Sequence, residues 1–195
     1  MAVPKYNPHY TLADYRQWEG SWELWHGVAV AMTPSPFGIH QWLSGQFART
    51  ILNQLDEQGC GDSFVVQDVD WVIADDFVVR PDISLVNGEL PERFIETAPE
   101  VVIEILSEST FEKDTQSKKT LYAKQGVRYY VMVDPWRWEC DIFELRGTKY
   151  QPLKPDIPLI IHGGCSLRLG MPIKPEGIKK SPKPKCSKEK PLRED

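Results

Sequence analysis

The segment VVIEIL, residues 101–106, carries one charged residue, Glu104, inside an otherwise apolar run. The run is short and rich in β-branched residues, AP precedes it and SEST follows it, and this pattern predicts a buried strand. A carboxylate in such a strand has a large desolvation cost unless a cation, a metal ion or hydrogen bonds compensate for it. Glu104 is therefore the first candidate for a functional residue.

A second apolar run, VVRPDISLV at residues 78–86, also carries an acid, Asp82. We expect this run to form a strand next to that of Glu104. Two strands that each present one carboxylate in an apolar setting suggest a site for a hard divalent cation, because Mg²⁺ takes oxygen ligands and commonly uses one or two carboxylates. The alternative is that both acids pair with Arg or Lys in a structural network, and these two residues favour neither hypothesis.

The surrounding sequence predicts one α/β domain over residues 1–170. Hydrophobic spacing and turn residues favour a mixed central β-sheet flanked by helices. Helices are expected at residues 11–18, 39–58 and 112–125. Strands are expected in a hairpin over 22–32 and then at 63–73, 78–86, 100–106, 127–133, 138–145, 149–153 and near 165–169.

The helix expected at residues 112–125 brings a cation toward the sheet. At helical spacing Lys118 shares a stripe with the apolar Leu121 and Tyr122, whereas Lys119 is rotated away by about 100°. Lys118 should therefore point inward, where it needs an acidic or phosphate partner. The alternative is a solvated helix along which the stem of Lys118 lies with its charge in water.

Composition describes an ordinary globular chain, 41% hydrophobic and 26% charged, with a basic end. Residues 171–195 carry about +4, so the first 170 residues carry about −9 of a total of −5, and Lys and Pro dominate after Met171. We predict a disordered tail at 171–195. The sequence lacks a signal peptide pattern and a run of about 18 apolar residues, which favours a cytoplasmic protein without a membrane partner.

The four cysteines show no C-x-x-C spacing, so we expect unpaired thiols rather than a zinc site or a disulfide framework. They are Cys60, Cys140, Cys165 and Cys186.

Taken in order, these motifs resemble the Uma-two family, described as "putative restriction endonuclease", within the PD-(D/E)XK nuclease superfamily. The similarity covers roughly residues 10–155: YTLADY, the WELWHGVAVAMTP hairpin, Asp82 in RPDISLV, Glu104 in VVIEILSEST, then Asp114, Lys118, Tyr122 and GVRYYVMVDP. The resemblance implies a restriction-endonuclease-like fold with a metal site at one edge of the sheet. It assigns Asp82 and Glu104 as the metal ligands.

The resemblance also assigns roles to further residues. Glu23 is similar to an additional acid of the first hairpin, although a Glu between two Trp residues can equally be exposed. His40 is similar to a histidine at the start of the long helix, where a structural histidine is the alternative. The superfamily pattern has a lysine two residues after the second acid, where this sequence has Leu106, and the resemblance suggests Lys118 as its counterpart.

The expected activity is hydrolysis of DNA phosphodiester bonds by an endonuclease that uses Mg²⁺ or Mn²⁺. Its expected catalytic residues are Asp82, Glu104, Lys118, Glu23 and His40. The resemblance alone implies a homodimer. The competing hypothesis is a catalytically inactive binding or interaction module, because a fold does not establish an activity and the displaced lysine and acidic charge oppose a nuclease.

Overall fold

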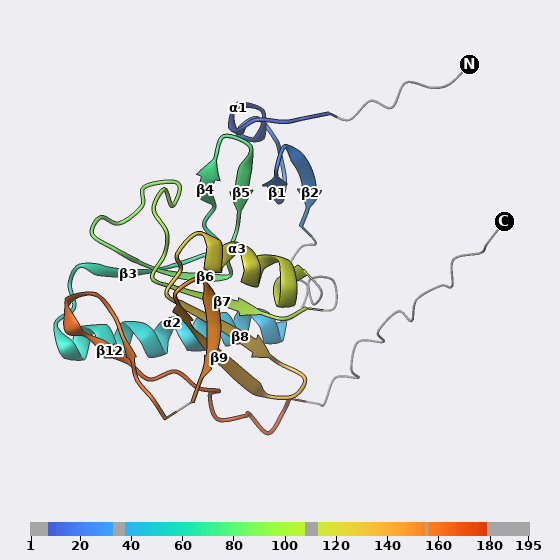
Figure 1. Ribbon diagram of the computed structural model, residues 1–195. Helices are drawn as coiled ribbons and strands as arrows, with labels where there is room; N and C mark the ends of the chain where they lie inside the picture. Colours follow the sequence, from blue (N-terminus) through green and yellow to red (C-terminus); the bar gives the residue numbers. More distant parts are fainter. Residues whose placement is uncertain (1–7, 33–37, 108–112, 155, 179–195) are drawn as a thin grey trace, which may run out of the picture.

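A six-stranded mixed sheet lies at the centre of the computed structural model, which describes residues 8–32, 38–107, 113–154 and 156–178 (Figure 1). The strands are β3 (Ser63–Gln67), β6 (Ile83–Asn87), β7 (Val101–Ile105), β8 (Tyr129–Asp134), β9 (Glu139–Arg146) and β10 (Lys149–Leu153). Their order is β10-β9-β8-β7-β6-β3. All neighbours are antiparallel except β7 and β8, which pair in parallel.

Helices cover both faces of this sheet. They are α2 (Gly38–Gln58) and, on the other face, α3 (Lys119–Lys124) preceded by a π-helical segment (Lys113–Lys118). A parallel pair of strands needs a crossover, and α3 with its π-helical segment supplies it between β7 and β8. Val102 belongs to the cluster that contains Leu121 of α3, whereas Ile103 belongs to the cluster that contains Phe47 of α2. The predicted alternation of β7 is thus confirmed.

A second, four-stranded sheet carries the first helix (Figure 1). Its strands, in the order β2-β1-β5-β4, are β2 (Val28–Ala31), β1 (Trp22–Trp25), β5 (Phe77–Val79) and β4 (Trp71–Ala74). The hairpin of β1 and β2 turns at His26 and Gly27, both with positive φ, as a tight two-residue turn requires. Helix α1 (Leu12–Tyr15) begins at Thr11 with the predicted cap, in which the Thr11 and Asp14 side chains bond each other's backbone N–H groups.

Two runs that were expected as single strands divide between the two sheets, and this corrects the prediction. The run 63–73 forms β3 and β4, with a break at Asp68, whose φ is 54°. The run 78–86 forms β5 and β6, and it breaks before Asp82 because Pro81 has no N–H to donate to a strand ladder. The two breaks lie together, since the Asp68 N–H donates to the Asp82 carbonyl at 3.1 Å. Asp82 therefore lies where the chain passes between the sheets.

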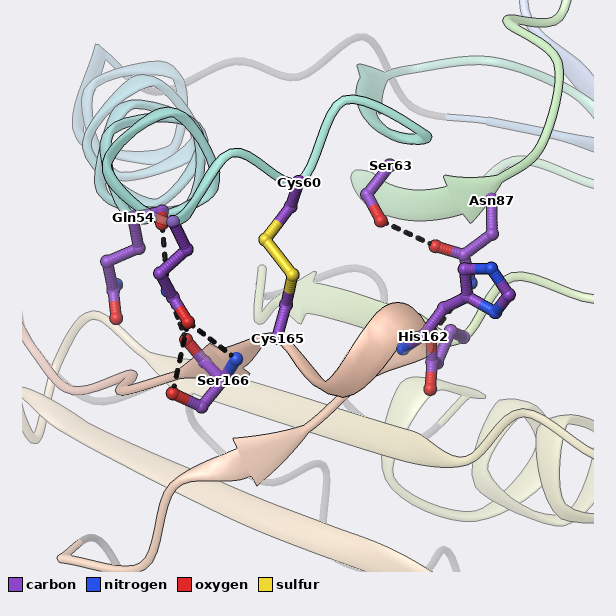
Figure 2. Close-up of a disulfide and its surroundings, with 9 residues drawn as sticks. Gln54, Cys60, Ser63, Asn87, His162, Cys165 and Ser166 are labelled. Atoms are coloured by element: carbon purple, nitrogen blue, oxygen red, sulfur yellow. Dashed lines mark hydrogen bonds between the residues drawn. A yellow bond between two sulfur atoms is a disulfide. The ribbon is translucent and has the colours of Figure 1, made fainter.

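A disulfide joins Cys60, just after α2, to Cys165, so the expectation of unpaired thiols is wrong for this pair (Figure 2). The two Cα atoms are 6.5 Å apart, although the cysteines lie 105 positions apart in the sequence. A pairing over such a distance cannot be recognised from the local spacing of cysteines. Cys165 lies between η2 (His162–Gly164) and the last strand of a small hairpin formed by β11 (Leu159–Ile160) and β12 (Ser166–Leu167). Among the described residues Cys140 is the free cysteine, and burial raises the pKa of its thiol to about 12.

The chain after residue 170 returns to the domain before the described part ends. Met171 packs against the main core, and the Pro172 carbonyl accepts a hydrogen bond from Trp138 Nε1 at 3.0 Å. Residues 179–195, which include Cys186 and most of the predicted tail, lie outside the described residues. In the ranges that are described, no helix combines the length and the hydropathy needed to cross a membrane.

Candidate active site

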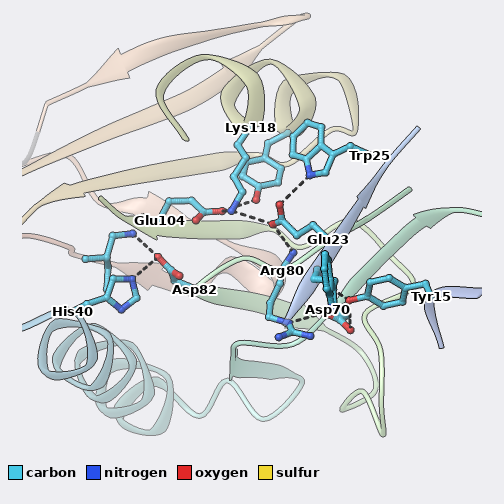
Figure 3. A network of polar contacts seen from close by, with 12 residues as sticks. Tyr15, Glu23, Trp25, His40, Asp70, Arg80, Asp82, Glu104 and Lys118 are labelled. Carbon is cyan, nitrogen blue, oxygen red and sulfur yellow. Dashed lines mark hydrogen bonds and ion pairs between the residues drawn. The ribbon is translucent and has the colours of Figure 1, made fainter. Parts of the chain in front are cut away.

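Glu104 of β7 is buried on the face of the sheet that α3 covers (Figure 3). Its residue exposure is 1%, and its Oε1 accepts two hydrogen bonds. One comes from Lys118 Nζ at 2.8 Å and the other from the Tyr122 hydroxyl at 2.6 Å. The desolvation cost of this carboxylate is therefore offset by a cation and a hydroxyl donor.

Glu23 of β1 is completely buried and faces the same lysine, which excludes the alternative of an exposed glutamate. Its Oε1 lies 3.4 Å from Lys118 Nζ and accepts the Arg80 backbone N–H at 3.1 Å. Its Oε2 accepts from Trp25 Nε1 at 2.9 Å. The second sheet thus contributes one acid to the cluster, and the neighbouring tryptophan holds that acid rather than leaving it in solvent.

Lys118 lies between these two acids, as the helical stripe predicts. Its exposure is 3%, and it ends the π-helical segment before α3. The next residue behaves differently: Lys119 Nζ lies 3.2 Å from the centroid of the Phe143 ring, and burial lowers the pKa of its amine. Leu106, at the position of the superfamily lysine, is buried in the core. The structure therefore places Lys118, and not a residue of the strand, at the carboxylate of Glu104.

Asp82 directly precedes β6, the strand next to that of Glu104. The pairs Ile83↔Ile103 and Ser84↔Val102 fix the register of β6 and β7, and Asp82 directly precedes the first residue of these pairs. Asp82 Oδ2 accepts the Ile105 N–H at 2.7 Å, a contact that ties its side chain to β7 beside Glu104.

His40, in the first turn of α2, contacts Asp82 rather than the buried lysine cluster. Its Nε2 lies 3.1 Å from Asp82 Oδ2, and the side chains of His40 and Asp82 are 10% and 16% exposed. The predicted residues therefore form two adjacent groups (Figure 3). Their members are Glu23, Glu104 and Lys118 in one group and Asp82 and His40 in the other. The side chain of Asp114 lies outside the described part of the structure.

Sequence reasoning missed three polar residues at the junction of the sheets. Asp68 is exposed, but partial desolvation and the negative charge of Asp82 raise the pKa of its carboxyl. Arg80 donates from Nε to Asp70 Oδ1 at 2.6 Å. Desolvation lowers the pKa of the guanidinium, but this hydrogen bond and the charge of Asp70 outweigh it, so the pKa is raised. Arg80 directly precedes the Pro81-Asp82 element, which was the one signal that could have singled it out.

The carboxylates of the site are the groups that a divalent cation would use. Glu23 and Glu104 face the ammonium group of Lys118, and Asp82 faces His40. Among the described residues no group of three or more His, Cys, Asp or Glu side chains is arranged to hold a metal ion. Asp82 and Glu104 still provide the one or two carboxylates that Mg²⁺ commonly takes, with water completing its coordination.

Comparison with known proteins identifies the family. The chain belongs to the Uma2 family, described as "Putative restriction endonuclease", whose model matches residues 12–163. It also resembles the crystal structure of "a putative nuclease belonging to DUF820" from Anabaena variabilis ATCC 29413, with a TM-score of 0.64, 18% sequence identity, and coverage of 80% of this chain and 90% of that chain. At this identity the likeness concerns the fold. A comparison with curated proteins finds no match. The family expected from the sequence is thus confirmed.

Proposed function

We propose that this protein has a restriction-endonuclease-like fold and is a metal-dependent endonuclease that hydrolyses phosphodiester bonds of DNA. The observation that carries the proposal is the position of Lys118 Nζ, 2.8 Å from Oε1 of Glu104. Glu104 belongs to β7, and the neighbouring strand β6 begins directly after Asp82. Two acids and a lysine in this arrangement are the elements that hydrolysis of a phosphodiester with a bound cation requires. Membership of the Uma2 family supports the same reaction class.

Asp82 and Glu104 would hold Mg²⁺ or Mn²⁺. The cation, when bound, lowers the pKa of a coordinated water and balances negative charge on the phosphate. Asp82 is oriented for this role by the Ile105 N–H and by His40. Asp82 is the least buried of the five residues, with its side chain 16% exposed, and a phosphate group would approach from its side.

Lys118 neutralises charge and positions Glu104. Its ammonium group has three donors, of which two face Glu23 and Glu104, so that Glu23 acts as the anchor that holds the lysine at the site. Tyr122 remains a donor to Glu104, because burial and the charge of Glu104 raise the pKa of its hydroxyl well above its ordinary value. The protein thus fixes the Glu104 carboxylate from two directions.

A second candidate function is a catalytically inactive binding module with a nuclease fold. The observation that favours it is that Lys118 is 3% exposed and already engaged by two carboxylates, which also describes a structural salt-bridge network. In this case the buried cluster stabilises the fold, and Asp82 and Glu104 do not bind a metal ion.

A cleavage assay separates the two functions. Supercoiled and linear DNA would be incubated with the wild-type protein in Mg²⁺, in Mn²⁺ and in EDTA, beside Glu104→Gln, Asp82→Asn and the control Glu139→Gln, an exposed acid at the start of β9. We expect metal-dependent cleavage that each site variant lowers by more than about 100-fold, beyond the loss typical of residues that only support metal ligands. The control should cleave normally. If folded wild-type protein gave the same DNA products with metal and with EDTA, the proposed nuclease function would be refuted.

A further inference from the structure

A pocket of about 290 Å³ is lined in part by Arg80, whose backbone N–H bonds Glu23 of the candidate active site. Aromatic and cationic side chains dominate its lining, with Asp70 as the single acid. The ones that matter for binding are Arg16, Arg80, Arg93, Trp18, Trp22 and Phe94. Three arginines against one acid form a locally basic site in a chain of net charge −5.

Two of these arginines are not engaged by acids. Arg80 is bonded to Asp70, whereas Arg16 and Arg93 form no ion pair within the described ranges. Both are exposed, and their guanidinium carbons lie 5.4 and 5.0 Å from the centroid of the Phe94 ring. The ring thus holds two guanidinium groups at the pocket, where their planar donors suit the oxygen atoms of a phosphate.

The pocket and the candidate active site share Arg80. The backbone N–H of Arg80 bonds Glu23, while the side chain of Arg80 lines the pocket. Arg80 also lies two positions before Asp82 in the sequence. Trp22 of the pocket directly precedes Glu23 in β1, and the Tyr15 hydroxyl bonds both the Trp22 carbonyl and Asp70. Figure 3 shows this network extending from Glu104 to Tyr15. Glu23, Arg80 and Asp70 therefore connect the pocket to the buried cluster of Glu104 and Lys118.

We propose that the pocket is a subsite for one unpaired nucleotide of the DNA strand, a proposal that rests on and deepens the proposed nuclease function. The base contacts the partly exposed rings of Trp18, Trp22 and Phe94, and a phosphate contacts Arg16 and Arg93. The pocket is at the small end of ligand-binding cavities, which suits a single nucleotide and is too narrow for a base pair with both its backbones.

Binding without cleavage tests the proposal. Affinity for a fluorescein-labelled single-stranded DNA 12-mer and for its duplex would be measured by anisotropy in EDTA at several salt concentrations. The test variant is Arg16→Gln with Arg93→Gln, and its matched control is Arg49→Gln with Arg137→Gln, two exposed arginines outside the pocket. The control removes the same charge.

We expect wild-type protein to prefer the single strand. The pocket variant should weaken single-strand binding by at least about 10-fold and lower the slope of log K against log salt by about 0.7, the value for one phosphate contact. The control variant should change neither quantity. Phe94→Leu should weaken the same binding, because it removes a ring that contacts the base and that holds both guanidinium groups at the pocket.

Three results would overturn the subsite. They are equal losses in the pocket and control variants, unaltered binding by the pocket variant, and duplex binding as tight as that of the single strand. Because the assay contains no metal and needs no cleavage, it is independent of the reaction. If the protein never cleaves DNA but its binding depends on the pocket, the nuclease function is refuted and the subsite stands. If the protein cleaves DNA but the pocket variant binds normally, the subsite is refuted and the nuclease function stands.

Discussion

Lys118→Met removes the ammonium group that lies between two buried carboxylates. Lys118 Nζ lies 2.8 Å from Glu104 Oε1 and 3.4 Å from Glu23 Oε1, and the three side chains are 4%, 2% and 1% exposed. Methionine preserves the length and the apolar stem of the lysine, so the variant tests the charge. Removing one partner of a buried ion pair costs about 3–5 kcal/mol, since the remaining charge stays desolvated.

The protein can limit this loss by protonating one of the two glutamates. For a carboxyl of ordinary pKa, about 4.3, uptake of a proton at pH 7 costs about 3.7 kcal/mol, and at pH 5 it costs about 1 kcal/mol. We therefore expect Lys118→Met to lower the free energy of unfolding by about 4 kcal/mol at pH 7 and by about 1 kcal/mol at pH 5. Urea denaturation followed by tryptophan fluorescence at the two pH values measures both quantities.

The adjacent lysine is the matched control for this measurement. Lys119 lies over the Phe143 ring, and its Lys119→Met variant should change stability by no more than about 1 kcal/mol, with little dependence on pH. A loss below about 1 kcal/mol for Lys118→Met at pH 7, or an equal loss at pH 5 and pH 7, would refute the assignment of Lys118 as the cation that compensates two buried acids.

Three further predictions concern stability measured by the same denaturation method. Cys165→Ser removes a cross-link that closes a loop of 105 residues and should lower the free energy of unfolding by about 2–4 kcal/mol. Tyr122→Phe removes the hydroxyl that donates to Glu104 at 2.6 Å and should cost about 1.5–3 kcal/mol. Desolvation and the charge of Asp82 raise the pKa of Asp68 in the folded state, so folding disfavours its charged form. Asp68→Asn should therefore stabilise the protein at pH 7. This gain should disappear as the pH falls toward 3.8, the ordinary pKa of the carboxyl.

Each of these variants has a control within the chain. Cys140→Ser changes a cysteine outside the disulfide and should cost less than Cys165→Ser. Tyr150→Phe removes a hydroxyl that donates to the neutral Val127 carbonyl, so a loss as large as that of Tyr122→Phe would contradict the role of the charged acceptor. Asp62→Asn neutralises an exposed acid just before β3, and a gain at pH 7 equal to that of Asp68→Asn would contradict the effect of Asp82.

Local patterns predicted the elements that surround Glu104. The alternation of residues 101–106 placed Glu104 and Val102 on one face, and the helical stripe turned Lys118 rather than Lys119 toward it. Both predictions follow from fixed geometric periods, two residues in a strand and 3.6 in a helix, and both are confirmed by the buried contact between Glu104 and Lys118.

Long-range pairing could not be predicted from these periods. Glu23 is buried because β1 pairs with β5, whose residues lie more than 50 positions later in the sequence. The apolar runs 63–73 and 78–86 look continuous, yet each passes from one sheet to the other, and only their neighbours in space decide where they break. The disulfide and the arginine pocket arise in the same way, from segments that meet only in the folded chain.

The central claim is that Asp82 and Glu104 together form a site for a divalent cation. Calorimetric titration with Mn²⁺ tests it directly, on wild-type protein, Asp82→Asn, Glu104→Gln and the control Glu139→Gln. The account predicts binding below millimolar concentration by wild-type and control protein, and the loss of this binding in each site variant. Absence of binding by folded wild-type protein at millimolar Mn²⁺, or unchanged binding by Glu104→Gln, would contradict it.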